Sequence, residues 1–280
     1  MKVAVLGVGL IGGSIGLAAR RRLDAEVAGW GHNRATVERA AGLGAVDRAA
    51  GSVAEACGGA EIVFCAAPVA VLPELAREAL AASGPDAVVT DAGSTKREIV
   101  AALGGDERFV GGHPLAGAET AGVENARADL FEGARWYLTP TERTGGILYD
   151  RLQRSVAALG ARPQAIDAET HDRVMATISH LPHVLANVLV AQAAGELGDG
   201  SERLPEVGPS FRDATRVAGS NPGIWADIFS ANAEPVAEAI DATVERLREA
   251  AELIRAGDRK ALLAWHAAAA EIRRHLEGEA

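Results

Sequence analysis

A histidine follows a strand-like run near the middle of the chain. Residues 109–111 are predicted to form a short strand, and His113 comes two residues later, directly before Pro114. Proline disfavours helix at the residue before it, so His113 is expected in a loop. Ligands in open α/β sheets bind beyond the carboxyl ends of strands, and an imidazole there can take a proton from a hydroxyl group. Such a general base contributes about 10²- to 10⁴-fold in rate, although an ordinary loop histidine fits this segment equally well.

A serine lies in a second loop, which follows a strand predicted for residues 87–91. Ser94 could cap the helix predicted for residues 96–103, which is the commoner role of a serine at a helix start. It could instead form a hydrogen bond with a substrate hydroxyl or with His113. Lys96, at the start of the same helix, is expected to be exposed to solvent.

Two arginines in the last third of the chain could bind an anion. Arg212 and Arg216 lie one helical turn apart and can share a face. They could clamp a carboxylate, with each charged hydrogen bond contributing about 1.5–3 kcal/mol. The alternative is a surface pair between Asp213 and Arg216, worth under about 1 kcal/mol. Trp225 follows in a segment where it could simply belong to the core.

Two histidines lie three residues apart beside a proline. His180 and His183 have no cysteine, aspartate or glutamate at ligand spacing, so no metal site is expected there. Pro182, between them, should kink the helix predicted for residues 169–197, because proline lacks a backbone donor and clashes with the preceding turn.

The glycine pattern at the N-terminus indicates a dinucleotide site. It follows a strand predicted for residues 3–6 and opens a helix predicted for residues 11–22, which is the context that the G-x-G-x-x-G motif requires. The first glycine permits the tight turn, the second lets the backbone approach a pyrophosphate, and the third allows close packing of helix on strand. The motif predicts cofactor contacts at Gly7, Gly9, Leu10, Ile11 and Gly12.

The end of the second predicted strand, residues 26–30, bears on the choice of nicotinamide cofactor. An acidic residue there would bind the ribose 2′-hydroxyl of NAD, but the position is Gly31. His32 and Arg34 follow it and could meet a 2′-phosphate instead. The sequence therefore favours NADP slightly over NAD.

The chain divides into two parts of different character. Strands alternate with helices over residues 1–166, which predicts a mostly parallel sheet covered by helices on both faces. No strand is expected in residues 167–280, where a break is predicted at residues 198–201 and two more helices at residues 234–256 and 259–276. We expect an α/β Rossmann-type domain, residues 1–166, followed by an all-α substrate and dimerisation domain, residues 167–280.

Composition excludes several classes of partner. The net charge of −10 over 280 residues argues against nucleic acid, and an anionic substrate would need locally placed arginine or histidine. The two cysteines, Cys57 and Cys65, form neither a C-x-x-C pair nor a disulfide framework and fit a reducing compartment. No signal peptide and no membrane-spanning run of 18 unbroken apolar residues is found, so a cytoplasmic protein is expected.

Five motifs together resemble the prephenate/arogenate dehydrogenase family over nearly the whole chain. They stand in the family's order and are far more specific jointly than singly. Their residues are Gly7-x-Gly9-Leu10-Ile11-Gly12-Gly13-Ser14, Asp91-x-Gly93-Ser94-x-Lys96, Gly112-His113-Pro114-x-Ala116-Gly117, Ser179-His180-Leu181-Pro182-His183 and Phe211-x-Asp213-x-Thr215-Arg216-x-Ala218-x-Ser220.

The resemblance implies roles for the residues singled out above. It implies an NAD(P)-dependent homodimer in tyrosine biosynthesis that oxidises and decarboxylates a cyclohexadienol. His113 would be the base for the C4 hydroxyl, Ser94 would lie near that hydroxyl and the nicotinamide, and Arg216 would hold a carboxylate. His183 and Trp225 would line the same pocket. Many members have Asp where Gly31 stands, which leaves the cofactor open.

Two alternatives remain at this point. A β-hydroxyacid dehydrogenase would carry a Lys-x-x-x-Asn pair on the first interdomain helix, whereas this helix offers His183 and Asn187 with no lysine. A non-catalytic, dinucleotide-sensing dimer would need the glycine motif but neither a base nor an anion clamp.

Overall fold

The computed structural model describes residues 1–117, 120–196 and 207–277, and the chain divides into two compact units. The first unit runs from Met1 to Ala233 and the second from Glu234 to Ala280. The first unit contains the sheet and every candidate site residue. The boundary expected at residue 166 lies inside this unit, between its α/β part and its helices, and stays a prediction.

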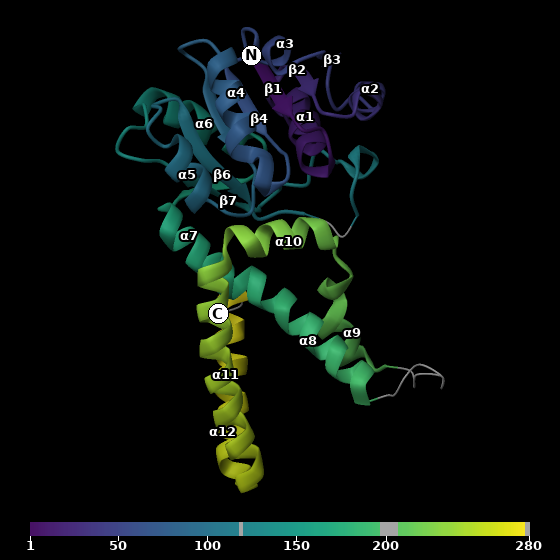
Figure 1. The fold of residues 1–280 in the computed structure, drawn as a ribbon, viewed down its shortest axis with the longest axis vertical. Helices are drawn as coiled ribbons and strands as arrows, with labels where there is room; N and C mark the ends of the chain where they lie inside the picture. Colours follow the sequence, from purple (N-terminus) through teal and green to yellow (C-terminus); the bar gives the residue numbers. More distant parts are fainter. Residues whose placement is uncertain (118–119, 197–206, 278–280) are drawn as a thin grey trace. The chain divides into compact units, whose positions relative to one another are not determined.

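An eight-stranded sheet forms the centre of the first unit (Figure 1). Its spatial order is β3-β2-β1-β4-β5-β6-β7-β8, and every neighbouring pair is parallel except β6 and β7. The strands are β1 (Lys2–Leu6), β2 (Glu26–Trp30), β3 (Arg48–Ala49), β4 (Ile62–Cys65), β5 (Val88–Asp91), β6 (Phe109–Pro114), β7 (Arg135–Thr139) and β8 (Arg162–Ala165). The mostly parallel sheet is therefore confirmed.

Helices cover both faces of the sheet because successive strand residues point to opposite sides. Val3 and Val5 of β1 pack in one core with α1, α2 and α6, whereas Ala4 and Leu6 pack in the other with α3, α4 and α5. These helices are α1 (Leu10–Leu23), α2 (Arg34–Gly42), α3 (Val53–Cys57), α4 (Leu72–Ala82), α5 (Arg97–Leu103) and α6 (Gly146–Ala158), with a 3₁₀ turn η1 (Val69–Val71) before α4. The sequence did not indicate β3 or α3, which are only two and five residues long.

A distorted helix connects the sheet to the rest of the unit. The single kinked helix expected for residues 169–197 is divided into α7 (Ala168–Met175), a π-helical turn η3 (Ala176–His180) and α8 (Leu181–Glu196). The π turn ends at His180, two residues before Pro182, which cannot donate a backbone hydrogen bond, so the helix is irregular next to the proline that was expected to kink it. Residue 197 and the break expected at residues 198–201 lie outside the described residues.

Three short helical segments that the sequence did not indicate complete the first unit. They are α9 (Pro209–Thr215), the 3₁₀ turn η4 (Arg216–Gly219) and α10 (Pro222–Ala231). The spacing of Arg212 and Arg216 had suggested that the two share a helix face. Since α9 ends at Thr215, they lie in different segments and do not share one regular helix face. Asn221 caps α10 by accepting from the N–H groups of Gly223 and Ile224.

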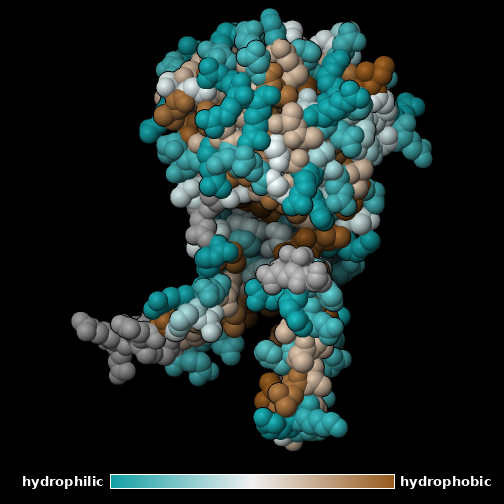
Figure 2. Space-filling view, turned by 180° about the vertical axis from the view of Figure 1, so that it is seen from behind, coloured by the Kyte–Doolittle hydropathy of each residue, from teal (hydrophilic) through white to brown (hydrophobic). Residues whose placement is uncertain are grey.

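The second unit is almost entirely a pair of helices, as expected. They are α11 (Ala233–Ala256) and α12 (Arg259–Glu277), and Gly257 between them has a φ of +65°. Asp258 then accepts hydrogen bonds from the N–H groups of Lys260 (2.9 Å) and Ala261 (3.2 Å), which starts α12. The pair exposes large apolar side chains, among them Leu247, Ile254, Leu263 and Trp265. Figure 2 shows hydrophobic surface, in brown, near its lower end.

Candidate active site

His113 lies inside the sheet rather than in a loop beyond it. β6 continues to Pro114 because its antiparallel partner β7 pairs with it, His113 opposite Tyr137 and Pro114 opposite Trp136. The expected loop position is therefore wrong, although the imidazole still lies at the carboxyl end of its strand. His113 is only 9% exposed.

A second histidine contacts the first. The Nδ1 atom of His113 lies 2.9 Å from Nε2 of His171 in α7, and the Nδ1 atom of His171 lies 2.7 Å from Oδ1 of Asp172. His171 and Asp172 are both 0% exposed, and the edge of Tyr137 packs against the His171 ring at 5.6 Å. Two buried imidazoles and a carboxylate thus form one continuous hydrogen-bonded chain.

The Asp172 carboxylate also begins α5. Its Oδ1 accepts the backbone N–H of Lys96 at 2.7 Å, and its Oδ2 accepts the N–H of Arg97 at 2.9 Å. A carboxylate that is remote in sequence therefore satisfies donors that open the helix, which removes the capping role considered for Ser94. Ser94 is half-buried in the preceding loop, and its hydroxyl bonds to no other described residue.

Lys96 is buried, which contradicts its expected exposure. Its ammonium group bonds to Oδ2 of Asp91, and both side chains are 0% exposed. Asp91 also accepts the N–H groups of Gly93 (2.8 Å) and Gly112 (3.0 Å), so its charge is fully compensated. The carboxylate joins the end of β5 to β6 one residue before His113.

Burial keeps these imidazoles neutral. Desolvation lowers the pKa of His113 well below its ordinary 6.5, and the nearby His171, Lys96 and His180 lower it further. Desolvation also lowers the pKa of His171, although its hydrogen bond to Asp172 acts in the opposite direction. A neutral His113 can accept a proton near pH 7.

His180 connects this chain to a second aromatic group. The amide nitrogen of Asn232 donates to the carbonyl of Asp172 at 2.8 Å and lies 3.1 Å from Nδ1 of His180. Burial lowers the pKa of His180 to about 4. The His180 and Trp225 rings form an edge-on contact, with centroids 5.9 Å apart.

Three residues predicted to share a pocket are brought together. The rings of His183 and Trp225 are stacked, with centroids 3.3 Å apart and 25° between planes. Burial lowers the pKa of His183, and the charge of Arg216 lowers it further, which puts the guanidinium near the same ring. Trp225 also contacts Phe229 at 5.3 Å and remains partly exposed, so it is not a fully buried core residue.

The glycine loop after β1 has the geometry that the motif predicts. Gly7 has a φ of +96°, and an added Cβ would lie 2.2 Å from the carbonyl oxygen of Ala66. At Gly12 an added Cβ would lie 1.8 Å from the Gly7 carbonyl oxygen, so the helix packs directly on the turn. Gly9 has open space beside it, and no side chain caps α1, so the free N–H groups at this helix start fit a pyrophosphate.

A pocket of about 260 Å³ lies at the end of β2. It is lined by Trp30, Gly31, His32, Arg34, Ala50 and Gly51. Asn33 caps α2 with its side chain, and Arg34 pairs with Glu38 at 2.8 Å on the surface. His32 and Arg34 therefore lie where the ribose end of a dinucleotide would be expected.

Two family models match almost the whole chain. The model of the prephenate dehydrogenase nucleotide-binding domain matches residues 15–164, and that of the prephenate dehydrogenase dimerization domain matches residues 167–268. The chain belongs to the prephenate dehydrogenase family.

Relatives and solved structures agree with this family. Prephenate dehydrogenase of Bacillus subtilis is 31% identical over 282 residues, which cover 97% of this chain and 75% of the relative. Cyclohexadienyl dehydrogenase of Zymomonas mobilis is 32% identical over 258 residues, covering 89% and 87%. A crystal structure of prephenate dehydrogenase from A. aeolicus in complex with hydroxyphenyl propionate and NAD+ matches with a TM-score of 0.89, 32% identity and coverage of 98% and 97%.

As a prephenate dehydrogenase family member, the chain is a nicotinamide-dependent oxidoreductase. The expected fold, a Rossmann-type domain followed by helices, is confirmed. The two alternatives, a β-hydroxyacid dehydrogenase and a non-catalytic sensor, are set aside by the family assignment.

Sequence reasoning missed His171 and Asp172. One signal was present: His171 stands four residues before Met175 and seven before Ile178, on the apolar stripe of the predicted helix. A polar residue on such a stripe must find a partner when buried. The identity of that partner, in β6, could not be derived from the pattern.

One helical stretch of this family member is apolar enough to cross a membrane by length and composition. It is Ala168–Glu196, whose most apolar window is 28% buried. The same stretch carries His171 and Asp172, which bond to β6 and α5 inside the globular unit. The stretch lies within the dimerization domain match, and its Val188 and Leu189 are exposed.

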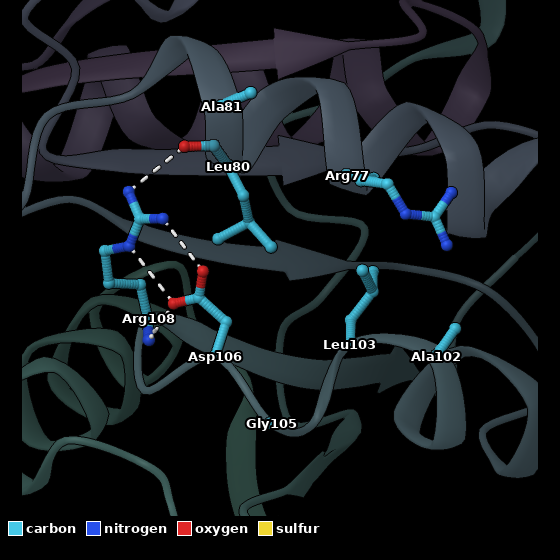
Figure 3. Close-up of a pocket in the computed structure, with 8 residues that line it drawn as sticks. All are labelled: Arg77, Leu80, Ala81, Ala102, Leu103, Gly105, Asp106 and Arg108. Carbon is cyan, nitrogen blue, oxygen red and sulfur yellow. Dashed lines mark hydrogen bonds and ion pairs between the residues drawn. The ribbon is translucent and has the colours of Figure 1, made fainter.

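A further pocket of about 440 Å³ lies at the opposite edge of the sheet. Figure 3 shows it between the ends of α4 and α5, with Arg108 bonded to Asp106 and to the carbonyl of Leu80. Arg77, on its rim, pairs with Glu74. The pocket adjoins the amino end of β6, whereas ligands of such sheets bind at the carboxyl ends, so it is not the active site. No group of three potential metal ligands occurs in the described ranges.

Proposed function

We propose that this chain oxidises prephenate or arogenate with His113 as the base that removes the C4 hydroxyl proton. The observation that carries the proposal is a buried, neutral imidazole at the carboxyl end of β6, one residue after Gly112, whose N–H bonds to Asp91 at the start of the Ser94 loop. When bound, the nicotinamide accepts the hydride from C4 of the substrate. Proton removal by His113 supplies the electrons that release this hydride, and loss of the ring carboxylate as CO2 leaves an aromatic ring.

Substrate binding is assigned to the cluster around Trp225. Arg216 holds a substrate carboxylate, while His183 and Trp225 form the wall beside it. Their stacking at 3.3 Å and the effect of Arg216 on the pKa of His183 support this assignment. A dianionic substrate also gives a reason for clustered cationic and imidazole groups in a chain of net charge −10. Ser94, which has an uncommitted hydroxyl among the described residues, donates to or accepts from the substrate hydroxyl.

The cofactor is proposed to be NADP in preference to NAD. The pocket lined by Gly31, His32 and Arg34 contains no acidic lining residue to repel a 2′-phosphate. Leu10 and Ile11, at the uncapped start of α1, would contact the pyrophosphate together with Gly7, Gly9 and Gly12. Measuring kcat/KM with both cofactors tests this preference, and a tenfold preference for NAD would end it.

The subunit is proposed to be half of a cytoplasmic homodimer joined through its helical domain. The match to a dimerization domain and the exposed apolar residues of α8 support the dimer. Sedimentation at micromolar concentration should show the dimer, and a monomer alone would contradict it. The two buried, free cysteines fit a reducing compartment.

One assay tests the activity itself. Prephenate and arogenate are each incubated with NAD+ and NADP+, and reduced cofactor, CO2 and aromatic product are measured together. The three products should appear in equal amounts with at least one pair. The proposed reaction would be contradicted if no combination of substrate and cofactor were turned over, or if the cofactor were reduced without release of CO2.

A further inference from the structure

Three buried side chains form a chain of two hydrogen bonds, and its proton positions have a functional consequence. The bonds join Nδ1 of His113 to Nε2 of His171 (2.9 Å) and Nδ1 of His171 to Oδ1 of Asp172 (2.7 Å). We infer that His171 and Asp172 hold His113 in the tautomer that a base needs, with its proton on Nδ1 and its lone pair on Nε2. The inference rests on the proposed role of His113 as the base and adds two positioning residues to it.

Asp172 determines which atom donates and which accepts in each of these two hydrogen bonds. Its Oδ1 accepts the N–H of Lys96 at 2.7 Å, and its Oδ2 accepts the N–H of Arg97 at 2.9 Å. Both oxygens therefore face backbone donors, which favours the carboxylate form of this side chain. A carboxylate can only accept a hydrogen bond from His171.

The tautomers of both histidines follow from that acceptor. His171 must carry its proton on Nδ1 in order to donate to Asp172, which leaves a lone pair on its Nε2. The only hydrogen bond that this lone pair can make with His113 is one that the Nδ1–H of His113 donates. The Nε2 atom of His113 then has no proton and is free to take one from a substrate.

The charges around His113 also favour this arrangement. The titratable groups that act on His113 are His171, Lys96 and His180, while His171 is in turn acted on by Asp172, Lys96 and Asp91 and carries the Tyr137 ring against it. The Lys96 charge is offset by its buried pair with Asp91. Asp172 is therefore the remaining negative group when both histidines are neutral. The imidazolium that forms on His113 after proton transfer donates its Nδ1–H to His171, which in turn donates to the Asp172 carboxylate. These two hydrogen bonds stabilise the positive charge on His113.

Three variants separate the contributions of the two hydrogen bonds and of the Asp172 charge. His171→Phe fills the same space and keeps the ring contact with Tyr137, but it removes both hydrogen bonds. His171→Gln retains an acceptor for His113 and loses the link to Asp172. Asp172→Asn keeps the size of the side chain and removes its charge. The matched control is Asp167→Asn, the same substitution at the N-cap of α7, where the side chain accepts only from Thr170.

We expect kcat to fall and the substrate KM to stay nearly constant. His171→Phe should lower kcat by about 10- to 100-fold, as expected for loss of an orienting partner. His171→Gln should lower it less, because the acceptor for His113 remains. Asp167→Asn should leave kcat unchanged. Equal kcat values for wild type and His171→Phe would overturn the inference, as would a loss confined to KM.

Nitrogen-15 NMR of labelled histidine reads the tautomer directly, with the His113 signals identified as those absent from His113→Asn. Neutral His113 should carry its proton on Nδ1 in the wild type and shift toward Nε2 protonation in His171→Phe. A wild-type protein with the proton on Nε2 would overturn the inference even if every variant failed to fold. If His113→Asn retains full turnover, the proposed base is wrong whatever the tautomer shows. If His113→Asn is inactive and His171→Phe is fully active, only the positioning role fails.

Discussion

The carboxylate of Asp91 bonds to the buried Lys96 ammonium group and also accepts the backbone N–H of Gly112, one residue before His113. One side chain therefore fixes the loop that carries Ser94 and the strand that carries the proposed base. The pair is fully enclosed, so each charge depends on the other for its stability.

Breaking this pair should destabilise the fold strongly. Lys96→Met leaves the Asp91 charge buried without its partner, and about 3–5 kcal/mol of unfolding free energy should be lost. Urea denaturation followed by circular dichroism measures the change. Arg77→Met, which removes an exposed partner of Glu74, is the control and should cost under about 1 kcal/mol. Similar losses in the two variants would contradict the buried-pair account.

Acid should destabilise the protein before its carboxylates titrate. Burial lowers the pKa values of His113, His171 and His180 in the folded state, whereas unfolded histidines titrate near 6.5. Below that pH the unfolded chain binds more protons, so stability is fully present above about pH 6.5 and falls as pH decreases.

His180 provides the sharpest case, because its folded pKa is about 4. Between these values one such histidine contributes a slope of about 1.4 kcal/mol per pH unit. Unfolding free energies measured across this window should decrease less steeply in His180→Gln than in the wild type. Parallel curves for the two proteins would show that His180 does not remain neutral in the fold.

Two substitutions in the glycine loop should have different effects on cofactor binding and on stability. Gly9→Ala adds a methyl group in open space, so the stability should change by less than about 1 kcal/mol while cofactor affinity falls. Gly12→Ala would place its Cβ 1.8 Å from a backbone oxygen and should cost about 1–3 kcal/mol or more. Thermal unfolding and fluorescence titration with reduced cofactor measure the two effects. Unchanged cofactor binding by Gly9→Ala would contradict the assigned pyrophosphate site.

Arg216 should act on substrate binding. Arg216→Ala removes a charged hydrogen bond to a carboxylate, and KM should rise by about 10- to 150-fold. Arg212→Ala, four residues earlier on the exposed side of α9, is the control and should leave KM unchanged. Steady-state kinetics with the preferred cofactor measures both. Equal KM values in the two variants would remove the clamp from Arg216.

Strands such as β1 and β4 could be predicted because each is a short, buried apolar run. The end of β6 could not, since the antiparallel pairing of His113 with Tyr137 extends that strand and depends on a segment 24 residues away. Likewise β3 consists of one exposed and one half-buried residue, too few to produce a periodicity.

The sequence indicated individual candidate site residues but not the side chains that bond to them. Single motifs indicated His113, Ser94 and Arg216, because their types suit proton transfer and anion binding. The sequence could not show that Lys96 is buried against Asp91, since a lysine at a helix start is exposed in most proteins. The cap of α5 by Asp172, 76 residues from Lys96, was equally hidden.

The most direct test of the account is turnover by His113→Ala compared with its cofactor binding. If the imidazole is the base, kcat should fall by about 10²- to 10⁴-fold while the dissociation constant for the cofactor stays the same. Full turnover by this variant, with the cofactor bound normally, would contradict the assignment of His113.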